Sequence, residues 1–180
     1  MGAIRLRDAV RGDAPALGVL HVASWRETYA GLLPDGLLAG LSAEARAAMW
    51  EGILADPASG ASVYVAEDEA GLIGFGACGP QRDTALAAAG YGGEIGALYV
   101  LGAHQRRGAG RALIAALAGA LTARGHAGAS LQVLRENRPA CAFYAALGGQ
   151  VVGEREEVQD GTTLVELVYG WRDLTLLSAR

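Results

Sequence analysis

The chain reads Glu94-Ile95-Gly96-Ala97-Leu98-Tyr99-Val100 near its middle and continues with Gln105-Arg106-Arg107-Gly108-Ala109-Gly110-Arg111. The first stretch is a short apolar run with β-branched and aromatic residues, which is typical of a buried strand. Beyond the second stretch, apolar residues recur at the spacing of one helix face, at Leu113, Ile114, Leu117 and Leu121. The sequence therefore predicts a strand that leads into a helix through a turn rich in glycine and arginine.

This turn has the chemistry of an anion site. The first N–H groups of a helix have no partner within the helix, and the helix dipole adds partial positive charge at that end. Gly108 and Gly110 lack a Cβ, so a ligand can approach the backbone closely. Arg106, Arg107 and Arg111 add cationic donors suited to phosphate. The turn alone leaves open a plainer reading, a solvated basic turn before an ordinary helix.

Two familiar phosphate loops do not fit the turn. A P-loop needs four residues between its glycines and then Lys followed by Ser or Thr, whereas one residue separates Gly108 from Gly110 and Arg111 follows. A dinucleotide-binding turn needs a third glycine or alanine where this chain has Leu113. A nucleotide-binding domain of either type is therefore disfavoured.

The turn resembles the Q/R-x-x-G-x-G/A turn of the GCN5-related N-acetyltransferase (GNAT) superfamily, whose backbone amides hold the pyrophosphate of acetyl-coenzyme A. The resemblance covers roughly residues 62 to 150. It includes Glu94, eleven residues before Gln105, and Asn137 and Phe143-Tyr144 further on. It implies a GNAT-like acyl-CoA N-acyltransferase fold of the α/β class, with a mostly antiparallel seven-stranded sheet, a central splayed pair of parallel strands, and flanking helices.

The periodicity along the chain predicts the remaining elements of a single domain, residues 1–180. Residues 80–93 are expected to be a loop, Glu67-Asp68-Glu69 a solvated turn, and Asp160-Gly161 the turn of a hairpin. Asp13, Ser42 and Asn137 are expected to begin helices, and Gly148-Gly149 to stop one. Further strands are expected around residues 4–6, 63–65, 72–75, 131–134, 151–158 and 163–169, and further helices around residues 13–28, 34–41, 42–54 and 137–147.

Composition narrows the class of protein. The formal charge of −4 argues against a nucleic-acid protein, because such domains usually carry a basic face. No hydrophobic signal region opens the chain and no apolar run reaches 18 residues, so a cytoplasmic protein without a membrane span is expected. Cys78 and Cys141 stand alone, in no metal-ligand pattern, and no metal is expected.

The resemblance implies a reaction: transfer of an acetyl group from acetyl-CoA to a primary amine of a small molecule or peptide, by direct attack in a ternary complex. It implies that Glu94 is the base and Tyr144 the acid that protonates the leaving thiolate. By the same resemblance, the groups that hold acetyl-CoA are those of Leu98, Tyr99, Val100, Gln105, Arg106, Arg107, Gly108, Ala109, Gly110, Arg111, Asn137 and Tyr144.

Residues 24–34 resemble a segment that encloses the acceptor site in a subset of these enzymes, which makes Trp25 and Tyr29 substrate-site residues. Both also fit a second interpretation, core packing at i and i+4. His21 is expected to be a packed or surface residue and not a catalyst. The family often has an aromatic residue after its Leu-Gly pair, whereas this chain has Gly149 after Leu147-Gly148.

Several alternatives stay open from the sequence. Glu94 fits an exposed carboxylate at a strand end, with a water chain as the base; Tyr144 fits a core tyrosine; and Asn137 fits a helix cap. The chain also fits a coenzyme A-binding regulatory module of the same fold that has lost catalysis. The identity of the amine and the existence of a homodimer are not fixed by these patterns.

Overall fold

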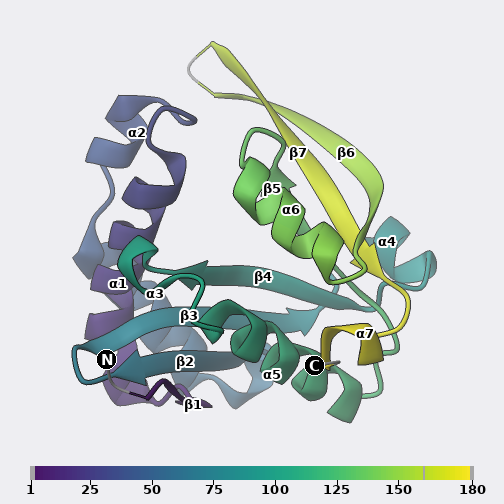
Figure 1. Cartoon of the computed structure of the whole chain (residues 1–180), viewed down its shortest axis with the longest axis horizontal. Helices are drawn as coiled ribbons and strands as arrows, with labels where there is room; N and C mark the ends of the chain where they lie inside the picture. The colour runs from purple at the N-terminus through teal and green to yellow at the C-terminus, as the bar shows by residue number, and fades with distance from the viewer. Residues whose placement is uncertain (1–2, 160, 179–180) are drawn as a thin grey trace.

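The computed structural model describes residues 3–159 and 161–178. Its strands form one seven-stranded sheet in the order β1-β2-β3-β4-β5-β7-β6, with helices packed around it (Figure 1). The strands are β1 Arg5–Asp8, β2 Ser62–Asp68, β3 Gly71–Pro80, β4 Gly93–Val100, β5 Ala129–Leu134, β6 Gln150–Gln159 and β7 Thr162–Trp171. The α-helices are α1 Ala14–Tyr29, α2 Asp35–Ala39, α3 Ala43–Ala55, α4 Thr84–Ala88, α5 Ala109–Ala123, α6 Arg138–Ala146 and α7 Thr175–Ser178.

The centre of the sheet is splayed. Strands β4 and β5 are the parallel pair, and they are in register only at Gly93 with Ala129 and at Glu94 with Ser130. The other neighbouring strands pair antiparallel. This arrangement confirms the predicted fold class, a mostly antiparallel sheet with a central parallel pair that diverges.

A β-bulge lies where the two central strands part. On β3, Ala77 pairs with Ala97 and the next residue, Cys78, pairs with Ile95, so Gly96 is the extra residue of β4. Bulges bend a strand and increase its local twist. The bulge therefore lies at the position where β4 leaves its partner β5.

Helices bury both faces of the sheet. On one face, Leu17 of α1 and Trp50 of α3 pack against Phe75 of β3. On the other face, Leu113 of α5 packs against Ile73 of β3. Burying a side chain of this size contributes about 1.5–3 kcal/mol, so these contacts fix the helices on β3, the antiparallel neighbour of β4.

Local signals set the helix starts, with one exception. The Ser42 hydroxyl accepts from the Ala45 amide at 3.1 Å and the Asn137 side chain accepts from the Ala140 amide at 3.3 Å, so both predicted caps are confirmed. Asp13 precedes α1 but does not cap it. Its carboxylate is bound instead by the Arg7 guanidinium at 2.7 and 2.9 Å, a partner from another element.

Two loop predictions were wrong. Residues 80–93 contain the ends of β3 and β4 and the helix α4, whose first amides, Ala85 and Leu86, donate to Asp83 at 2.8 and 3.0 Å. The acidic stretch predicted as a solvated turn includes the end of β2, and it is not simply solvated. Glu67 and Asp68 form ion pairs with arginines distant in sequence, Arg5, Arg7 and Arg107.

The last hairpin is confirmed by the antiparallel pairing of β6 with β7, while Asp160 of its predicted turn lies outside the described residues.

His21 is a packed residue, as expected: it is 6% exposed and its Nδ1 accepts from Trp50 Nε1 at 3.2 Å. Burial, with a smaller effect of Arg46, lowers the pKa of His21 to about 4. None of the described helices has the length and apolar character needed to cross a bilayer.

Candidate active site

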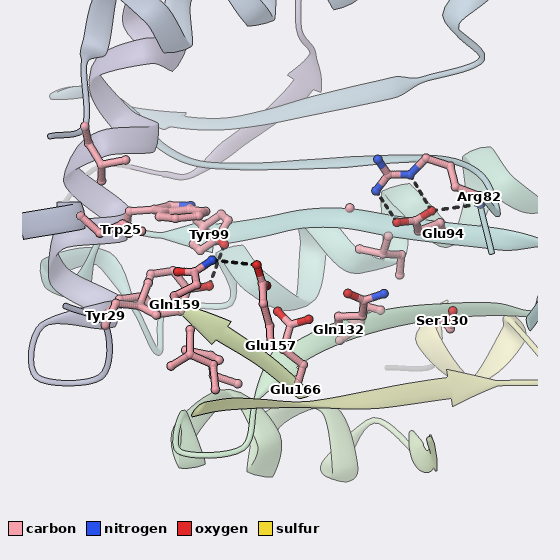
Figure 2. Close-up of a pocket in the computed structure, with 18 of the residues that line it drawn as sticks. Trp25, Tyr29, Arg82, Glu94, Tyr99, Ser130, Gln132, Glu157, Gln159 and Glu166 are labelled. Atoms are coloured by element: carbon pink, nitrogen blue, oxygen red, sulfur yellow. Dashed lines mark hydrogen bonds and ion pairs between the residues drawn. The ribbon is translucent and has the colours of Figure 1, made fainter. Parts of the chain in front are cut away.

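Two cavities meet where β4 and β5 diverge. One, of about 820 Å³, lies along β4, the head of α5 and the start of α6, and we call it the cofactor cavity. The other, of about 550 Å³, lies between α1, α2, β4, β5 and the β6–β7 hairpin, and we call it the acceptor cavity (Figure 2). Six residues line both: Tyr29, Ile95, Gly96, Tyr99, Leu131 and Gln132. The splay is therefore a passage from one cavity to the other.

The turn before α5 opens onto the cofactor cavity. Gly108 takes a left-handed conformation, with φ of 90°, as the residue that precedes the helix. Within the described part of the chain, the amides of Gly108, Ala109 and Gly110 donate to no backbone carbonyl. The turn residues that line this cavity are Gln105, Arg106, Gly108, Gly110 and Arg111. The turn thus presents amides and cations to the same space.

Arg107, predicted to hold the cofactor, lies against Asp68 and His104 instead. Its Nη1 lies 3.0 Å from Asp68 Oδ2 and 2.9 Å from His104 Nδ1, and it is not among the residues that line the cofactor cavity. The backbone N–H of Ala70, and then Arg107, hold the pKa of Asp68 below its usual value. Arg107 therefore ties the turn to the β2–β3 hairpin. The sequence missed this contact because Asp68 is 39 positions away.

The free edge of β4 forms the wall of the passage. Leu98, Tyr99 and Val100 line the cofactor cavity, and on their other side they pair with β3, for example Gly76 with Leu98. Toward β5, the described register stops at Glu94. Backbone groups beyond Glu94 consequently face the cavity and not a neighbouring strand. The Val100 carbonyl accepts from Gln105 Nε2 at 2.9 Å, which joins the strand to the turn.

Asn137 and Tyr144 reach the cofactor cavity from the far side, on α6. The Asn137 oxygen caps the helix, which leaves its amide nitrogen for other partners. Tyr144 is 7% exposed and its ring lies against Tyr169 and Trp171, with centroids at 5.8 and 6.2 Å. Burial raises the pKa of Tyr144 well above its usual value, so the hydroxyl keeps its proton at neutral pH.

An aromatic group covers one side of the acceptor cavity. The Trp25 ring meets the Tyr29 ring edge-on at 5.1 Å, and the Tyr29 hydroxyl lies 2.9 Å from the Tyr99 hydroxyl. The Arg46 guanidinium stands 5.2 Å from the Trp25 ring centre. Trp25 and Tyr29 both line the cavity, and each also packs on its neighbours. Burial raises the pKa of both tyrosines.

Glu94 lies at the closed end of the splay, where β4 still pairs with β5. Arg82 binds it through Nη2 at 2.6 Å, Nε at 3.0 Å and the backbone N–H at 3.2 Å (Figure 2). These hydrogen bonds from Arg82 hold the pKa of Glu94 below its usual value, against the opposing effect of burial. The carboxylate is therefore ionised and clamped at neutral pH.

Several polar residues of the acceptor cavity were not identified from the sequence, among them Gln132 of β5, Glu157 of β6 and Glu166 of β7. One signal was present. Glu166 interrupts the apolar run Leu164-Val165-Glu166-Leu167-Val168, and a charge within an apolar strand is unusual. No group of three or more His, Cys, Asp or Glu residues with the arrangement of a metal site occurs among residues 3–159 and 161–178.

A sheet splayed at its central parallel pair, with an amide-rich turn opening onto the gap, is the acyl-CoA N-acyltransferase fold. A family model supports this assignment. Residues 23–148 match the model described as the acetyltransferase (GNAT) family, and the chain belongs to that family.

Known proteins of similar sequence and structure agree. The N-acetyltransferase YuaI of Bacillus subtilis (strain 168) is 35% identical over 175 residues, which covers 97% of this chain and 96% of YuaI. The PaiA N-acetyltransferase of Thermoplasma acidophilum, solved in complex with coenzyme A, has a TM-score of 0.72 at 21% identity. The match covers 92% of this chain and 98% of the PaiA chain. The YncA structure from Salmonella typhimurium, solved with acetyl-CoA, has a TM-score of 0.71 at 20% identity. The match covers 96% of this chain and 94% of the YncA chain.

Proposed function

We propose that this protein transfers the acetyl group of acetyl-CoA to a primary amine of a small molecule or peptide, by direct attack in a ternary complex. The observation that carries the proposal is the passage at the splay, which joins a cavity with a phosphate-type turn to a second cavity. Two similar structures hold coenzyme A or acetyl-CoA. Acetyl-CoA supplies an activated thioester, and the second cavity has room for an acceptor beside it.

The residues present fit the cofactor. The amides of Gly108, Ala109 and Gly110 would bind the pyrophosphate, with Arg106 and Arg111 adding positive charge. The pantetheine arm would follow the open edge of β4 from Val100 to Leu98 and meet the Asn137 amide. Apart from the buried Ala109, these residues line one cavity, so a single extended ligand can contact them together.

Two proton transfers complete the reaction. The amine nitrogen attacks the thioester carbonyl, the C–N bond forms, and the developing oxyanion is stabilised by a β4 amide such as that of Leu98. As the C–S bond breaks, Tyr144 would donate its proton to the thiolate of coenzyme A. The amine must also lose a proton, because an alkyl ammonium with a pKa of ~10.4 is almost fully charged at pH 7. Glu94, the glutamate that the family resemblance indicates, is one candidate for that base, directly or through water.

The phosphate-turn assignment is tested at Gly110. A Cβ at Gly110 would meet its nearest atom, Phe143 Cζ, at 3.6 Å, which is ordinary contact, and Gly110 lines the cofactor cavity, so a side chain there would occupy space beside the turn. We expect Gly110→Val to abolish acetyl-CoA binding measured by calorimetry. Gly119→Val is the matched control, since Gly119 lies on the same helix and a Cβ there meets nothing within 4 Å.

Gly119→Val should bind acetyl-CoA as the wild type does, because Gly119 lies on the same helix but does not line the cofactor cavity. Gly108→Val should also abolish binding, although its φ of 90° strains any side chain. Undiminished binding by Gly110→Val would show that the pyrophosphate lies elsewhere.

A further inference from the structure

Glu166 occupies a distinctive place in the acceptor cavity. It lies near the middle of β7, paired with Arg155 on β6 and with Leu134 on β5, so its half-buried side chain rises from a continuous sheet. Figure 2 shows Glu166 and Glu157 reaching toward the Tyr29–Tyr99 pair, while Glu94 lies beside Arg82 at the other end of the cavity. Since Tyr29 and Tyr99 line both cavities, Glu166 faces the passage through which a thioester would be presented.

The groups around Glu166 come from three elements. From β5, the Gln132 amide nitrogen donates to Glu166 Oε2 at 3.1 Å, in the orientation in which its oxygen accepts from Arg155 Nη1 at 2.8 Å. From β6, Glu157 places a like charge and Arg155 an opposite charge near Glu166, and Arg155 also forms an ion pair with Asp83. From α1, Tyr29 lies close enough for the charge of Glu166 to raise its pKa. Gln132 thus orients the Glu166 carboxylate, while the Arg155 guanidinium is shared between Gln132 and Asp83.

Glu94 and Glu166, two carboxylates of the acceptor cavity, are in opposite situations. Arg82 clamps Glu94 with three hydrogen bonds and keeps its pKa low. Burial and the charge of Glu157 raise the pKa of Glu166, and Arg155 only partly opposes them. A base works best when its pKa approaches the working pH, and a divergence of this kind between two carboxylates assigns them different roles.

We infer that Glu166, and not Glu94, takes the proton from the acceptor amine. The inference rests on the proposed function and specifies the base of that reaction. One Glu166 oxygen accepts a proton from the ammonium, and the neutral nitrogen then forms the C–N bond with the thioester carbonyl. The C–S bond breaks and the thiolate receives the proton of Tyr144. The nitrogen loses its second proton as the amide forms, Tyr144 is reprotonated through solvent, and Glu166 releases its proton to solvent, so one proton is released per turnover. Glu94 and Arg82 then serve to fix the closed end of the splay.

The dependence of kcat/KM on pH tests the inference. Activity is measured as thiol release from acetyl-CoA with n-butylamine, 2-phenylethylamine, 1,4-diaminobutane and a tri-alanine peptide, and the fastest acceptor is kept. With Glu166 as base, kcat/KM for the wild type rises through the pKa of Glu166 and then stays level up to the pKa of the acceptor ammonium, which is ~10.4 for an alkyl amine and about 8 for the peptide N-terminus. In Glu166→Gln only the neutral amine reacts, so kcat/KM rises about tenfold per pH unit across that range.

At pH 7 we expect Glu166→Gln to lose about 10²–10⁴-fold in kcat/KM with an alkyl amine, or about tenfold with the peptide, and to recover toward the wild type as the pH rises. In Glu94→Gln, kcat/KM should stay constant over the same pH range as in the wild type. Glu154→Gln is the matched control, because Glu154 precedes Arg155 on β6 and alternation turns it to the opposite face, where it pairs with Arg135. Its activity should equal that of the wild type.

Each remaining outcome overturns a specific statement. If Glu166→Gln keeps the wild-type profile while Glu94→Gln rises tenfold per unit, the inference is wrong and Glu94 is the base. If Glu166→Gln is slower by the same factor at every pH, Glu166 has a structural role only. If the wild type releases no thiol with any of the four acceptors, the proposed function itself fails, which is a different result from either of these.

Discussion

Tyr144 combines packing and proposed chemistry in one side chain. Its ring is held between α6 and β7 by Phe143, Tyr169 and Trp171, with centroid distances of 5.5, 5.8 and 6.2 Å. The same residue lines the cofactor cavity beside Asn137. The sequence offered core tyrosine and acid as alternatives, and the position of Tyr144 is compatible with both. A rigidly packed ring is a good support for a proton donor, because its hydroxyl cannot drift from the cavity.

Removing that hydroxyl separates the two roles. In Tyr144→Phe the ring contacts remain, so we expect the free energy of unfolding and the acetyl-CoA affinity to change little. Turnover should fall by about 10²–10⁴-fold, the usual contribution of a general acid. Steady-state kinetics with calorimetry checks this. Tyr169→Phe is the control, since Tyr169 packs against Tyr144 but does not line the cavity; equal turnover in the two variants would make Tyr144 a packing residue.

The contact between α6 and β7 explains the departure at Gly149. A Cβ on Gly149 would lie 2.6 Å from Trp171 Cζ2 and 2.8 Å from the Tyr144 carbonyl oxygen. The Trp171 indole, anchored by a hydrogen bond from Nε1 to the Leu147 carbonyl at 3.0 Å, fills the space next to this glycine. Trp171 is 1% exposed. An aromatic residue from β7 therefore occupies the core here, and position 149 has no room for a side chain.

Because the Trp171 indole fills the space beside Gly149, substitutions at these two positions should be coupled. Gly149→Ala should destabilise the wild type by about 1–3 kcal/mol, as expected for overpacking. In a Trp171→Leu background the same change should cost less, because two of the three close contacts belong to the indole. Urea unfolding of the four proteins measures the coupling, expected at about 0.5–3 kcal/mol. Additive effects would mean that the Tyr144 carbonyl alone excludes the side chain.

Elements whose signals are local were predicted well. The strand-turn-helix unit from Glu94 to Leu121 and the caps Ser42 and Asn137 depend on neighbours a few residues apart, which one sequence displays. The contacts that modify the site join distant positions, such as Arg82 with Glu94 and Arg107 with Asp68. Arginine and carboxylate residues have many possible partners, and only the fold selects one. The same reason hid Glu166, which reaches the acceptor cavity because β7 is inserted between β5 and β6.

Taken together, the chain forms two sheet regions that share a short seam. Strands β1 to β4 lie on one side and β5, β7 and β6 on the other, and β4 and β5 are in register at two positions. Helix α5 packs on the first region and α6 lies over the second (Figure 1). The Tyr144 ring of α6 contacts Tyr169 of β7. The cofactor cavity is lined from both regions, by Leu98 and Gly110 on one and by Asn137 and Tyr144 on the other. A ligand in that cavity would supply contacts that the seam lacks.

Acetyl-CoA should therefore stabilise both regions together. A ligand at 100 times its Kd adds about 2.7 kcal/mol to the free energy of unfolding, and local openings across its site should become rarer by a similar factor. We expect hydrogen exchange to slow in β4 and the head of α5, and equally in β5 and the start of α6, which Asn137 begins. Gly110→Val should show no such change at the same acetyl-CoA concentration, and Gly119→Val should behave as the wild type. Protection confined to the turn before α5 would mean that the diphosphate is bound while the arm does not bridge the splay, and the direct-attack geometry would then lack its support.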